Sequence, residues 1–553
     1  MSSTPTSSPA NPQSPRPPFL PVPLSDSEST LISSLHLQYT PILSAPAPFP
    51  LPSFSSTITA LLQHPERTGP LILRAEPLPP PVPPIPGSTE LFKGWRPVEV
   101  SRRRLLPRVP ERDGELIQTC VRYRRSNVGE RGEGEMLVLT PELLESASIP
   151  YYHPDVQRLA LIYTSSPLST EDGAEAHGQI QIEVVLPPSA PSQVSSNSRL
   201  YRTCLHLLET THKHSWGHLS GYRKRVRHDV LLPRAEYQDL YMRLKQRHKH
   251  HVSSWSLGTD PRKHVFEVKK AELDVAIAAF LMLLWKLDYP ALGVPRAPLL
   301  VGENPEREER CEWSTWGRPE GGFVDLGCGN GLLVHILLQE GYEGYGIDLS
   351  PRKTWASFSP STQAHLHAAA ISPLSSPPVS PPLPPGAFLL GNHADELTPY
   401  VPLLATLHAA SGWLVIPCCA YTFTARFTAT SYRSRLGRSE VEQRMDEGGE
   451  GGGRVRAYLV WLEEMGRGLG WSVGLEALRM PSTRNWGLVG RRAVDGLEED
   501  GEQLEIDGEG QEERGARRVV SREEGLLWAK EKLEEIRCSG GFQVREGKGH
   551  GHH

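Results

Sequence analysis

The stretch FVDLGCGNG at residues 323–331 decides the fold of the second half of this 553-residue chain. A short apolar run ends at an acid, Asp325, and three glycines follow at alternate positions, Gly327, Gly329 and Gly331. The residues after them, LLVHILLQEG, predict a helix. A strand, a glycine-rich turn and a helix in this order present backbone N–H groups and a helix N-terminus to a nucleotide-like ligand.

The glycine pattern excludes two common phosphate sites. The dinucleotide fingerprint needs glycine three residues after its second glycine, where this chain has Leu332, and no G-K-[ST] of a Walker loop follows. The carboxylate of Asp325 would repel a diphosphate and suits a ligand with a cationic amine. S-adenosylmethionine has such an amine, and Asp348, 21 residues after Gly327, has the spacing of a ribose-binding acid. The two features resemble the first two motifs of class I methyltransferases.

The order of segments after Gly322 predicts the fold class. Strands FVDL, GYGID, AFLLGN and GWLVIPCC alternate with helices, and WSVGLEALRM and NWGLVGR end the series. We therefore expect an α/β fold, a Rossmann-like class I methyltransferase with a mostly parallel seven-stranded sheet. A smaller mixed region should precede it, with disordered N-terminal and C-terminal segments.

Composition divides the chain into four parts. Residues 1–90 are rich in Pro and Ser and predict a disordered arm, and 91–255 reads as a mixed β-rich and basic region that is a candidate for binding nucleic acid. Residues 256–492 should form the methyltransferase domain, and 493–553 an acidic linker with a helix at 521–537 and a tail. The inserts at 372–386 and 446–453 should be disordered surface loops.

The remaining composition excludes several classes of protein. Seven cysteines form no C-x-x-C pair, which speaks against a structural zinc site or a disulfide framework, so we expect no metal. No signal pattern opens the chain, and the apolar run VAIAAFLMLLW (275–285) is too short to span a bilayer. We expect a cytoplasmic protein that does not enter membranes.

Longer blocks make the resemblance more specific. GYRKRVRHD (221–229), DVAIAAFLMLLW (274–285), the glycine-loop region 323–355, LLGNHADELTPYVPLL (389–404) and RMPSTRN (479–485) occur in order. Together they resemble the tRNA (uracil-2′-O-)-methyltransferase family that modifies uridine 44 of serine tRNA. One departure is the six residues VKKAEL (268–273) before Asp274, which we expect to alter local geometry and leave the cofactor site untouched.

The chemistry of ribose methylation suggests which residues act. Ligands of open α/β sheets lie outside the carboxyl ends of strands, and GNHADE follows the strand AFLLG there. Asp395 or His393 is the candidate base, with Lys353 or Arg352 as the electrostatic partner, although Asp395 could instead cap a helix. Cys418 and Cys419 read as small buried residues at a strand end. The expected cofactor-binding residues are Asp325, Gly327, Gly329, Asn330, Gly331, Asp348 and Asn392.

The RNA site should include the basic block 211–251, where cations and aromatic side chains alternate, unless this is only a solvated face. The residues chosen for phosphate contact are Arg223, Lys224, Arg225, Arg227 and Arg484. The resemblance implies tRNA as the partner, serine tRNA above all, with an accessory RNA-binding protein as an open alternative. Two other functions stay open: a catalytically silent scaffold that binds RNA or protein, and a methyltransferase acting on protein or a small molecule.

Overall fold

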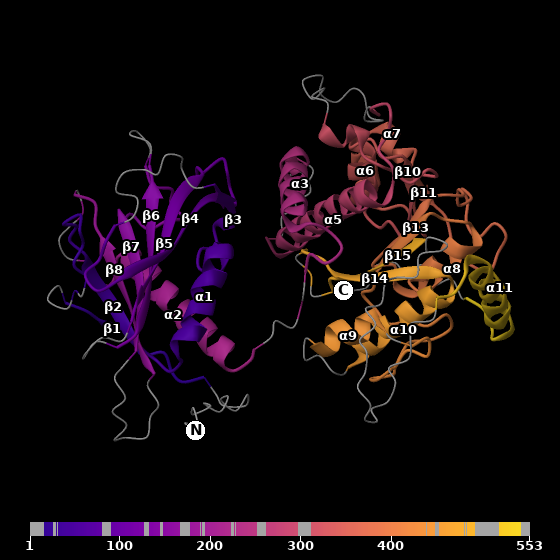
Figure 1. Ribbon diagram of the computed structural model, residues 1–553. Helices are drawn as coiled ribbons and strands as arrows, with labels where there is room; N and C mark the ends of the chain where they lie inside the picture. The colour runs from indigo at the N-terminus through magenta and orange to yellow at the C-terminus, as the bar shows by residue number, and fades with distance from the viewer. Residues whose placement is uncertain are drawn as a thin grey trace, which may run out of the picture. The chain divides into compact units, whose positions relative to one another are not determined.

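The computed structural model describes residues 16–25, 29, 31–79, 90–126, 132–143, 148–165, 177–188, 190, 194–222, 226, 228–250, 261–296, 311–437, 439–447, 453–480, 482, 484–492 and 519–542. The chain divides into two compact units, Met1–Tyr222 and Arg223–His553 (Figure 1). This boundary falls inside the range 91–255 that composition groups together, so the end of the β-rich part and the start of the basic part belong to different units.

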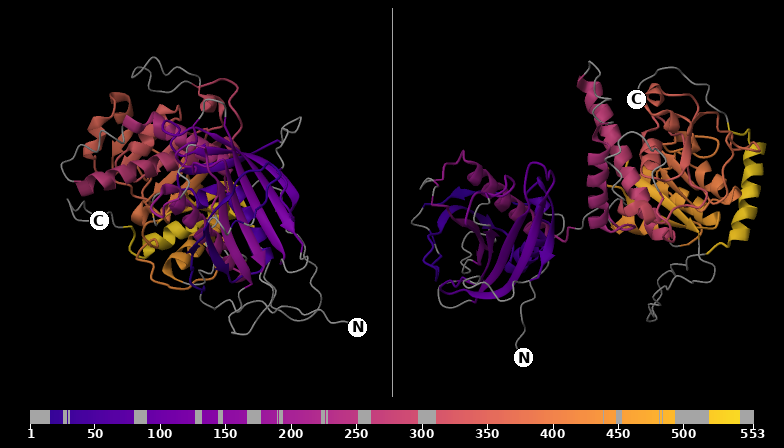
Figure 2. Two further views of the ribbon diagram at one scale, coloured as in Figure 1. Left: turned by 90° about the vertical axis from the view of Figure 1, so that its left-hand side faces the viewer. Right: turned by 90° about the horizontal axis from the view of Figure 1, so that it is seen from above.

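The first unit is built on an eight-stranded antiparallel sheet in the order β1-β2-β8-β7-β6-β5-β4-β3. Helices α1 (Leu51–Gln63) and α2 (Arg199–Leu219) pack on one face of this sheet, where Phe54, Ile58 and Leu208 are buried against the strands (Figure 1). The views of Figure 2 show how strongly the sheet curls. Its strands are β1 (Val22–Pro23), β2 (Thr40–Ala47), β3 (Ile72–Leu78), β4 (Arg96–Pro107), β5 (Leu116–Arg125), β6 (Gly134–Glu142), β7 (Arg158–Ser165) and β8 (Gly178–Val185).

The prediction of a disordered segment over residues 1–90 is wrong, because β2, α1 and β3 lie within it. In TPILSAPA the buried apolar side chains are Ile42, Leu43, Ala45 and Ala47, and the high proline content of the segment conceals them. Proline is tolerated because β1 pairs with only two residues of β2 and a bulge follows Pro41. Composition measures average hydrophobicity, and it missed a strand whose buried apolar residues stand among prolines and serines.

The second unit contains a seven-stranded sheet in the order β11-β10-β9-β12-β13-β15-β14. The neighbours from β11 to β13 run parallel, whereas β15 is antiparallel to both β13 and β14. The strands are β9 (Phe323–Leu326), β10 (Gly344–Asp348), β11 (Leu366–Ala368), β12 (Phe388–Asn392), β13 (Gly412–Ile416), β14 (Trp471–Ala477) and β15 (Trp486–Arg492).

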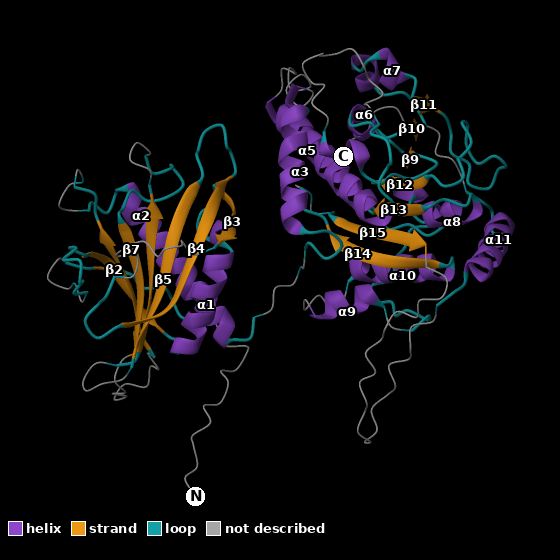
Figure 3. Cartoon of the chain, turned by 45° about the horizontal axis from the view of Figure 1, so that its top comes forward, coloured by secondary structure: helices purple, strands orange, loops and turns teal. Residues whose placement is uncertain are grey.

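Helices cover both faces of this second sheet (Figure 3). One core packs α3, α5 and α6 on the side chains of Phe323, Phe388 and Leu414, and the other packs α8, α10 and α11 on the alternate residues Val324, Leu389 and Trp413. The helices are α3 (Arg234–Arg247), α5 (Pro261–Asp288), α6 (Leu332–Gln339), α7 (Pro360–Gln363), α8 (Tyr400–Leu407), α9 (Glu440–Glu447), α10 (Arg454–Gly468) and α11 (Arg522–Cys538). Alternate residues of a strand face opposite sides, so each buried strand serves both cores.

The predicted fold class is therefore wrong. A mostly parallel seven-stranded Rossmann-like sheet with a smaller mixed region does not describe the chain, since its larger sheet is entirely antiparallel and its second sheet is mixed. The segments between Leu91 and Pro233 predict short strands of a small β-rich region, but they do not show that these strands join β2 and β3 in one eight-stranded sheet.

The insert at 372–386 also departs from its predicted disorder. Val379 and Leu383 are buried in the core shared with α8 and α10, and the hydroxyl of Tyr345 donates to the carbonyl of Pro382 at 2.9 Å. Two apolar side chains are sufficient to fix a proline-rich segment whose backbone is already stiff. Most of the second insert, 446–453, lies outside the described residues.

Candidate functional site

The glycine loop connects β9 to α6 and takes backbone angles that favour glycine. The φ angles of Gly327, Gly329 and Gly331 are 85°, 55° and 79°. A Cβ on Gly331 would lie 2.9 Å from Leu366 Cδ1 and 3.2 Å from Trp355 Nε1, so this glycine permits close packing. A Cβ on Gly327 or Gly329 would come no closer than 3.7 Å to another residue, so these two backbones border open space that a ligand can use.

Asp348 lies beside this loop, as its spacing predicts. The last residue of β10, it is 6% exposed, and its Oδ2 accepts the N–H of Gly329 at 3.0 Å. Its Oδ1 accepts from the Arg352 guanidinium at 3.1 Å, while that arginine side chain is 54% exposed. The two neighbouring strands β9 and β10 therefore bring the loop and the acid into direct contact.

Asp325 is the most enclosed polar residue of the site. It is 1% exposed, and in the part of the chain that the structure describes its Oδ1 has no hydrogen-bond partner. Burial first, and then the charges of Asp274 and Asp348, raise the pKa of Asp325 to about 8. A buried acceptor without a donor costs free energy, which a ligand that donates to it or carries positive charge would recover.

Asp274 is a member of this site that the sequence analysis missed. It is 5% exposed on α5, and its Oδ2 accepts from Asn330 Nδ2 at 3.2 Å. The VKKAEL insert is part of the same continuous helix and Asp274 follows it directly, and the expectation that the insert leaves the cofactor site untouched stays a prediction. The sequence does contain a signal for Asp274, because this acid directly precedes the apolar run VAIAAFLMLLW. An acid that is buried with such a run needs a polar partner.

Two further residues fix the glycine loop from the η5 turn, the 3₁₀ helix Lys353–Ser357. Trp355 Nε1 donates to the carbonyl of Gly329 at 2.9 Å, and Thr354 Oγ1 donates to the carbonyl of Asn330 at 2.8 Å. Neither residue was predicted. Lys353, the predicted electrostatic partner, is exposed in the same turn, so its side chain faces solvent next to residues that contact the loop.

The GNHADE segment leaves β12 at the same sheet edge. β12 is the parallel neighbour of β9 with Leu390 opposite Asp325, and the Cβ of Ala394 lies 3.7 Å from the position a Cβ would take on Gly327. Asn392 Oδ1 is buried and has no hydrogen-bond partner among the described residues. His393 and Asp395 have φ angles of 54° and 46°, a backbone strained for side chains other than glycine, which is common at functional sites.

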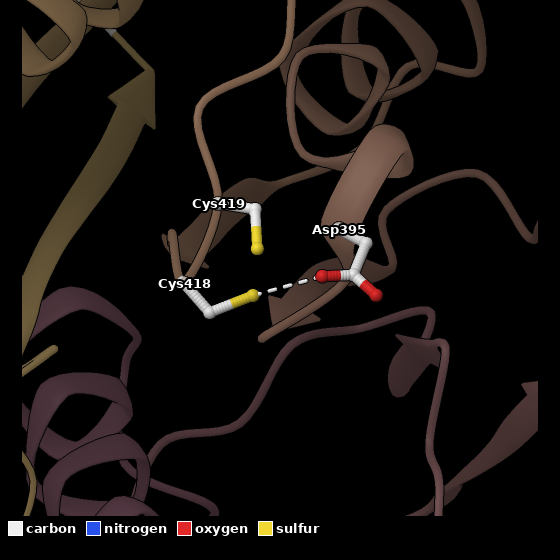
Figure 4. Close-up of side chains that lie close together, drawn as sticks. All are labelled: Asp395, Cys418 and Cys419. Atoms are coloured by element: carbon white, nitrogen blue, oxygen red, sulfur yellow. Dashed lines mark hydrogen bonds between the residues drawn. The ribbon is translucent and has the colours of Figure 1, made fainter. Parts of the chain in front are cut away.

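Asp395 meets the two cysteines that follow β13 (Figure 4). The thiol of Cys418 donates to Asp395 Oδ1 at 3.0 Å, and burial together with the Asp395 charge raises the pKa of that thiol. The expectation of two buried cysteines is wrong, because Cys419 is exposed and Cys418 is only partly buried. One ligand atom from each of Asp395, Cys418 and Cys419 lies within 4.8 Å of the others, so these residues could hold a thiophilic cation, although the sequence predicts no metal.

The predicted RNA-binding residues are only partly described. Arg223, Lys224, Arg225 and Arg227 lie outside the described residues, and Arg484 is exposed before β15. The chain just after the basic run is fixed firmly: the Glu476 carboxylate accepts the N–H groups of Asp229 (3.0 Å), Val230 and Leu231 (both 2.8 Å). Arg479 forms a two-pronged ion pair with Asp229. These bonds attach residues 229–231 to the end of β14, beside the loop that carries Arg484.

Family models match both units of the chain. The model described as "TRM44-like, N-terminal bet v1-like domain" matches residues 18–225, and "Predicted AdoMet-dependent methyltransferase" matches residues 231–293 and 313–373. The second match includes Asp274, the glycine loop and Asp348. In the part of the chain that the structure describes, no helix is long and apolar enough to cross a membrane.

Curated relatives cover most of the chain. A protein of Schizosaccharomyces pombe is 33% identical over 80% of this chain and 82% of its own length. One of Neurospora crassa is 33% identical over 70% and 71%, and one of Saccharomyces cerevisiae is 30% identical over 71% and 69%. All three carry the name "tRNA (uracil-O(2)-)-methyltransferase".

Proposed function

The chain belongs to the tRNA (uracil-O(2)-)-methyltransferase family, and we propose that it methylates the ribose 2′-hydroxyl of uridine 44 in serine tRNA. It is an S-adenosylmethionine-dependent tRNA methyltransferase, as the relatives and the methyltransferase family model indicate. The choice of serine tRNA and of position 44 is the finer part of the proposal and rests on the sequence resemblance. The observation that carries the cofactor assignment is the buried, unpartnered Oδ1 of Asp325 behind an open glycine loop.

The described residues fit S-adenosylmethionine. Gly327 and Gly329 leave room for a ligand against the backbone, and Asp325 and Asn392 each offer a buried oxygen without a hydrogen-bond donor among the described residues. Asp348 offers a carboxylate suited to ribose hydroxyls, and Asn330 and Gly331 complete the loop. Bound there, the cofactor supplies a methyl group activated by a neighbouring sulfonium. The enzyme's own part is to hold the acceptor in line and to receive its proton.

We assign Asp395 as the general base that accepts the proton of the ribose 2′-hydroxyl. It is exposed at the sheet edge of the glycine loop, so a ribose hydroxyl can reach it, and its carboxylate is held by the Cys418 thiol. His393 in the same segment is the second candidate, and Arg352 or Lys353 supplies positive charge for the developing alkoxide. Cys418 acts here by orienting the base, because its raised pKa keeps the thiol protonated.

Replacing Asp348 by alanine should weaken S-adenosylmethionine binding by about 1.5–3 kcal/mol, the scale of a hydrogen bond to a charged group. The loss combines the ligand's contact with the support that Asp348 gives to Gly329. Titration calorimetry on the purified protein measures it. Glu343→Ala is the matched control, because Glu343 stands at the opposite end of β10 and pairs with Arg296 on the surface. Equal affinities of both variants and wild type would remove Asp348 from the site.

For tRNA we propose that the basic run Arg223–Arg227 and Arg484 contact phosphates. The hydrogen bonds of Glu476 to residues 229–231 support this, because they attach the end of the basic run to the strand that precedes the Arg484 loop. The basic run is therefore joined to residues 229–231, and the Arg484 loop to β14, at places that lie next to each other.

We also propose that the enzyme works in the cytoplasm, which imaging of a tagged chain tests. Methyl-transfer activity of the purified chain alone would argue against the need for an accessory protein.

Alanine at Arg223, Lys224, Arg225 and Arg227 together should weaken tRNA binding and reduce the salt slope by about 3, at roughly 0.7–0.9 for each lost phosphate contact. S-adenosylmethionine affinity should not change. Filter binding across a salt series measures the slope. The control removes four positive charges from α11, Arg522, Lys530, Lys532 and Arg537. A slope equally reduced in both variants would mean that net charge, and not this segment, governs binding.

A further inference from the structure

Three carboxylates from three separate elements surround the glycine loop. Asp274 comes from α5, Asp325 from β9 and Asp348 from β10, and their exposed fractions are 5%, 1% and 6%. Among the described contacts of this group, Arg352 is a cation bound to Asp348, and its side chain is half exposed. Burying several like charges together is costly unless a proton or a cation compensates them.

The surroundings of Asp325 favour a proton in the free protein. Burial and the charges of Asp274 and Asp348 raise its pKa to about 8. The neighbouring Cys328 thiol has a raised pKa as well, because of burial and then of Asp325 and Asp348, so it stays neutral and adds no charge to the loop. The free Oδ1 of Asp325 is the oxygen at which a donor would be received.

Asp274 connects this group to the loop's conformation. Its Oδ2 accepts from Asn330 Nδ2, and Asn330 Oδ1 accepts the N–H of Leu332, the first residue of α6, at 2.9 Å. A helix N-terminus needs acceptors for its first N–H groups, so Asn330 has a capping function that Asp274 orients. The carboxylate of Asp274 therefore influences both the charge of the pocket and the position of its backbone.

We propose that Asp274, Asp325 and Asp348 act as one acidic pocket that holds a proton in the free enzyme and releases it to solvent when S-adenosylmethionine binds. The inference rests on the proposed cofactor site and concerns its selectivity. The cofactor has positive charges on its sulfonium and its amine, which replace the proton as the compensating charge. The demethylated product lacks the sulfonium, so it compensates the carboxylates less well and leaves more readily.

The affinity for S-adenosylmethionine should rise with pH. Below about pH 8 the free pocket is protonated and must lose a proton to bind the cation, so affinity should rise about tenfold per pH unit from pH 6 to 8. Above that range the pocket is already ionised and affinity should level off. Affinity for the demethylated product should change less with pH, because its charge compensation is smaller.

Calorimetric titration of the full chain with S-adenosylmethionine, in phosphate and in Tris at pH 7, counts protons from the difference in apparent enthalpy. We expect a release of close to one proton, which should disappear by pH 9. Binding without proton release between pH 6 and 8 would overturn the inference. A methyl-transfer assay on tRNA separates the two proposals: if transfer persists while binding releases no proton, the inference fails and the proposed function stands.

Asp274→Asn tests the role of Asp274 itself. The amide keeps an oxygen for Asn330 and removes a charge next to Asp325, so Asp325 should ionise at lower pH and proton release at pH 7 should fall. The preference for cofactor over product should fall as well. Glu272→Gln is the control, because Glu272 lies on the same helix as Asp274 and its carboxylate pairs with Lys245 of α3. A purely structural Asp274 would change the affinity and leave the proton count at the wild-type value, which would exclude it from the pocket.

Discussion

Asp395→Asn is expected to slow single-turnover methyl transfer to unmodified serine tRNA by about 10²–10⁴, the range of general base catalysis. Asparagine keeps the shape of the side chain and an oxygen for the Cys418 thiol, but it cannot take a proton from the ribose hydroxyl. Binding of S-adenosylmethionine and tRNA should stay at wild-type levels, since the residue is exposed at the edge of the site and is not part of the glycine loop. Rapid quench with radiolabelled methyl donor measures the rate.

Glu396→Gln is the matched control for this experiment, because Glu396 lies in the same 3₁₀ turn, Asp395–Leu397. It should retain the full rate. If Asp395→Asn also retains it, the base lies elsewhere, with His393 as the next residue to replace, or positioning alone is sufficient. An Asp395→Asn enzyme that no longer binds tRNA would show instead that this carboxylate shapes the substrate site.

A chain that begins at Leu91 is expected to lose the fold of the first unit. The truncation removes β1, β2, α1 and β3, and with them the buried Leu43, Phe54 and Ile58. Loss of one buried aromatic side chain costs about 3–5 kcal/mol, and a domain has about 5–15 kcal/mol in total. Removing β2 also leaves the backbone groups on one edge of β8 without a partner strand.

Amide hydrogen exchange of peptides from β5 to β8 measures this loss without interference from the second unit. Protection of these strands should fall to the level of an unfolded chain. A chain that begins at Arg16 keeps every described contact and should retain full protection. Native protection in the Leu91 chain would mean that the remaining strands form a stable sheet on their own, and would restore the idea of a dispensable N-terminal arm.

The family, the cofactor and the reaction class could all be predicted from the sequence, and the relatives and family models confirm them. The glycine loop and Asp348 are encoded within 26 residues, and the hydrogen bond between Gly329 and Asp348 joins two neighbouring strands. Local order along the chain is sufficient for such a motif, because a strand, a turn and a helix of fixed lengths place their own residues. The roles of His393, Asp395, Lys353 and Arg484 stay predictions.

The antiparallel first sheet was not predicted, because it depends on pairing between strands that lie far apart in the sequence. Segments such as TPILSAPA contribute Ile42, Leu43, Ala45 and Ala47 to its core, but their proline and serine content gives them the average composition of a disordered chain. Only pairing with β8, 131 or more positions away, makes these residues a core. An isolated strand has no stable structure, so its sequence says little until its partners are known.

What the sequence by itself determined is the local chemistry: an acid at the end of β9, glycines that open the backbone to a ligand, and an acid at the end of β10. Only the tertiary structure decided which distant groups join it. Packing of α5 brings Asp274 to Asn330 across 56 positions, and the parallel pairing of β12 and β13 brings Cys418 to Asp395 across 23. The physical reason is that charge and hydrogen bonding act over a few ångströms, and folding alone sets those distances between residues far apart in the chain.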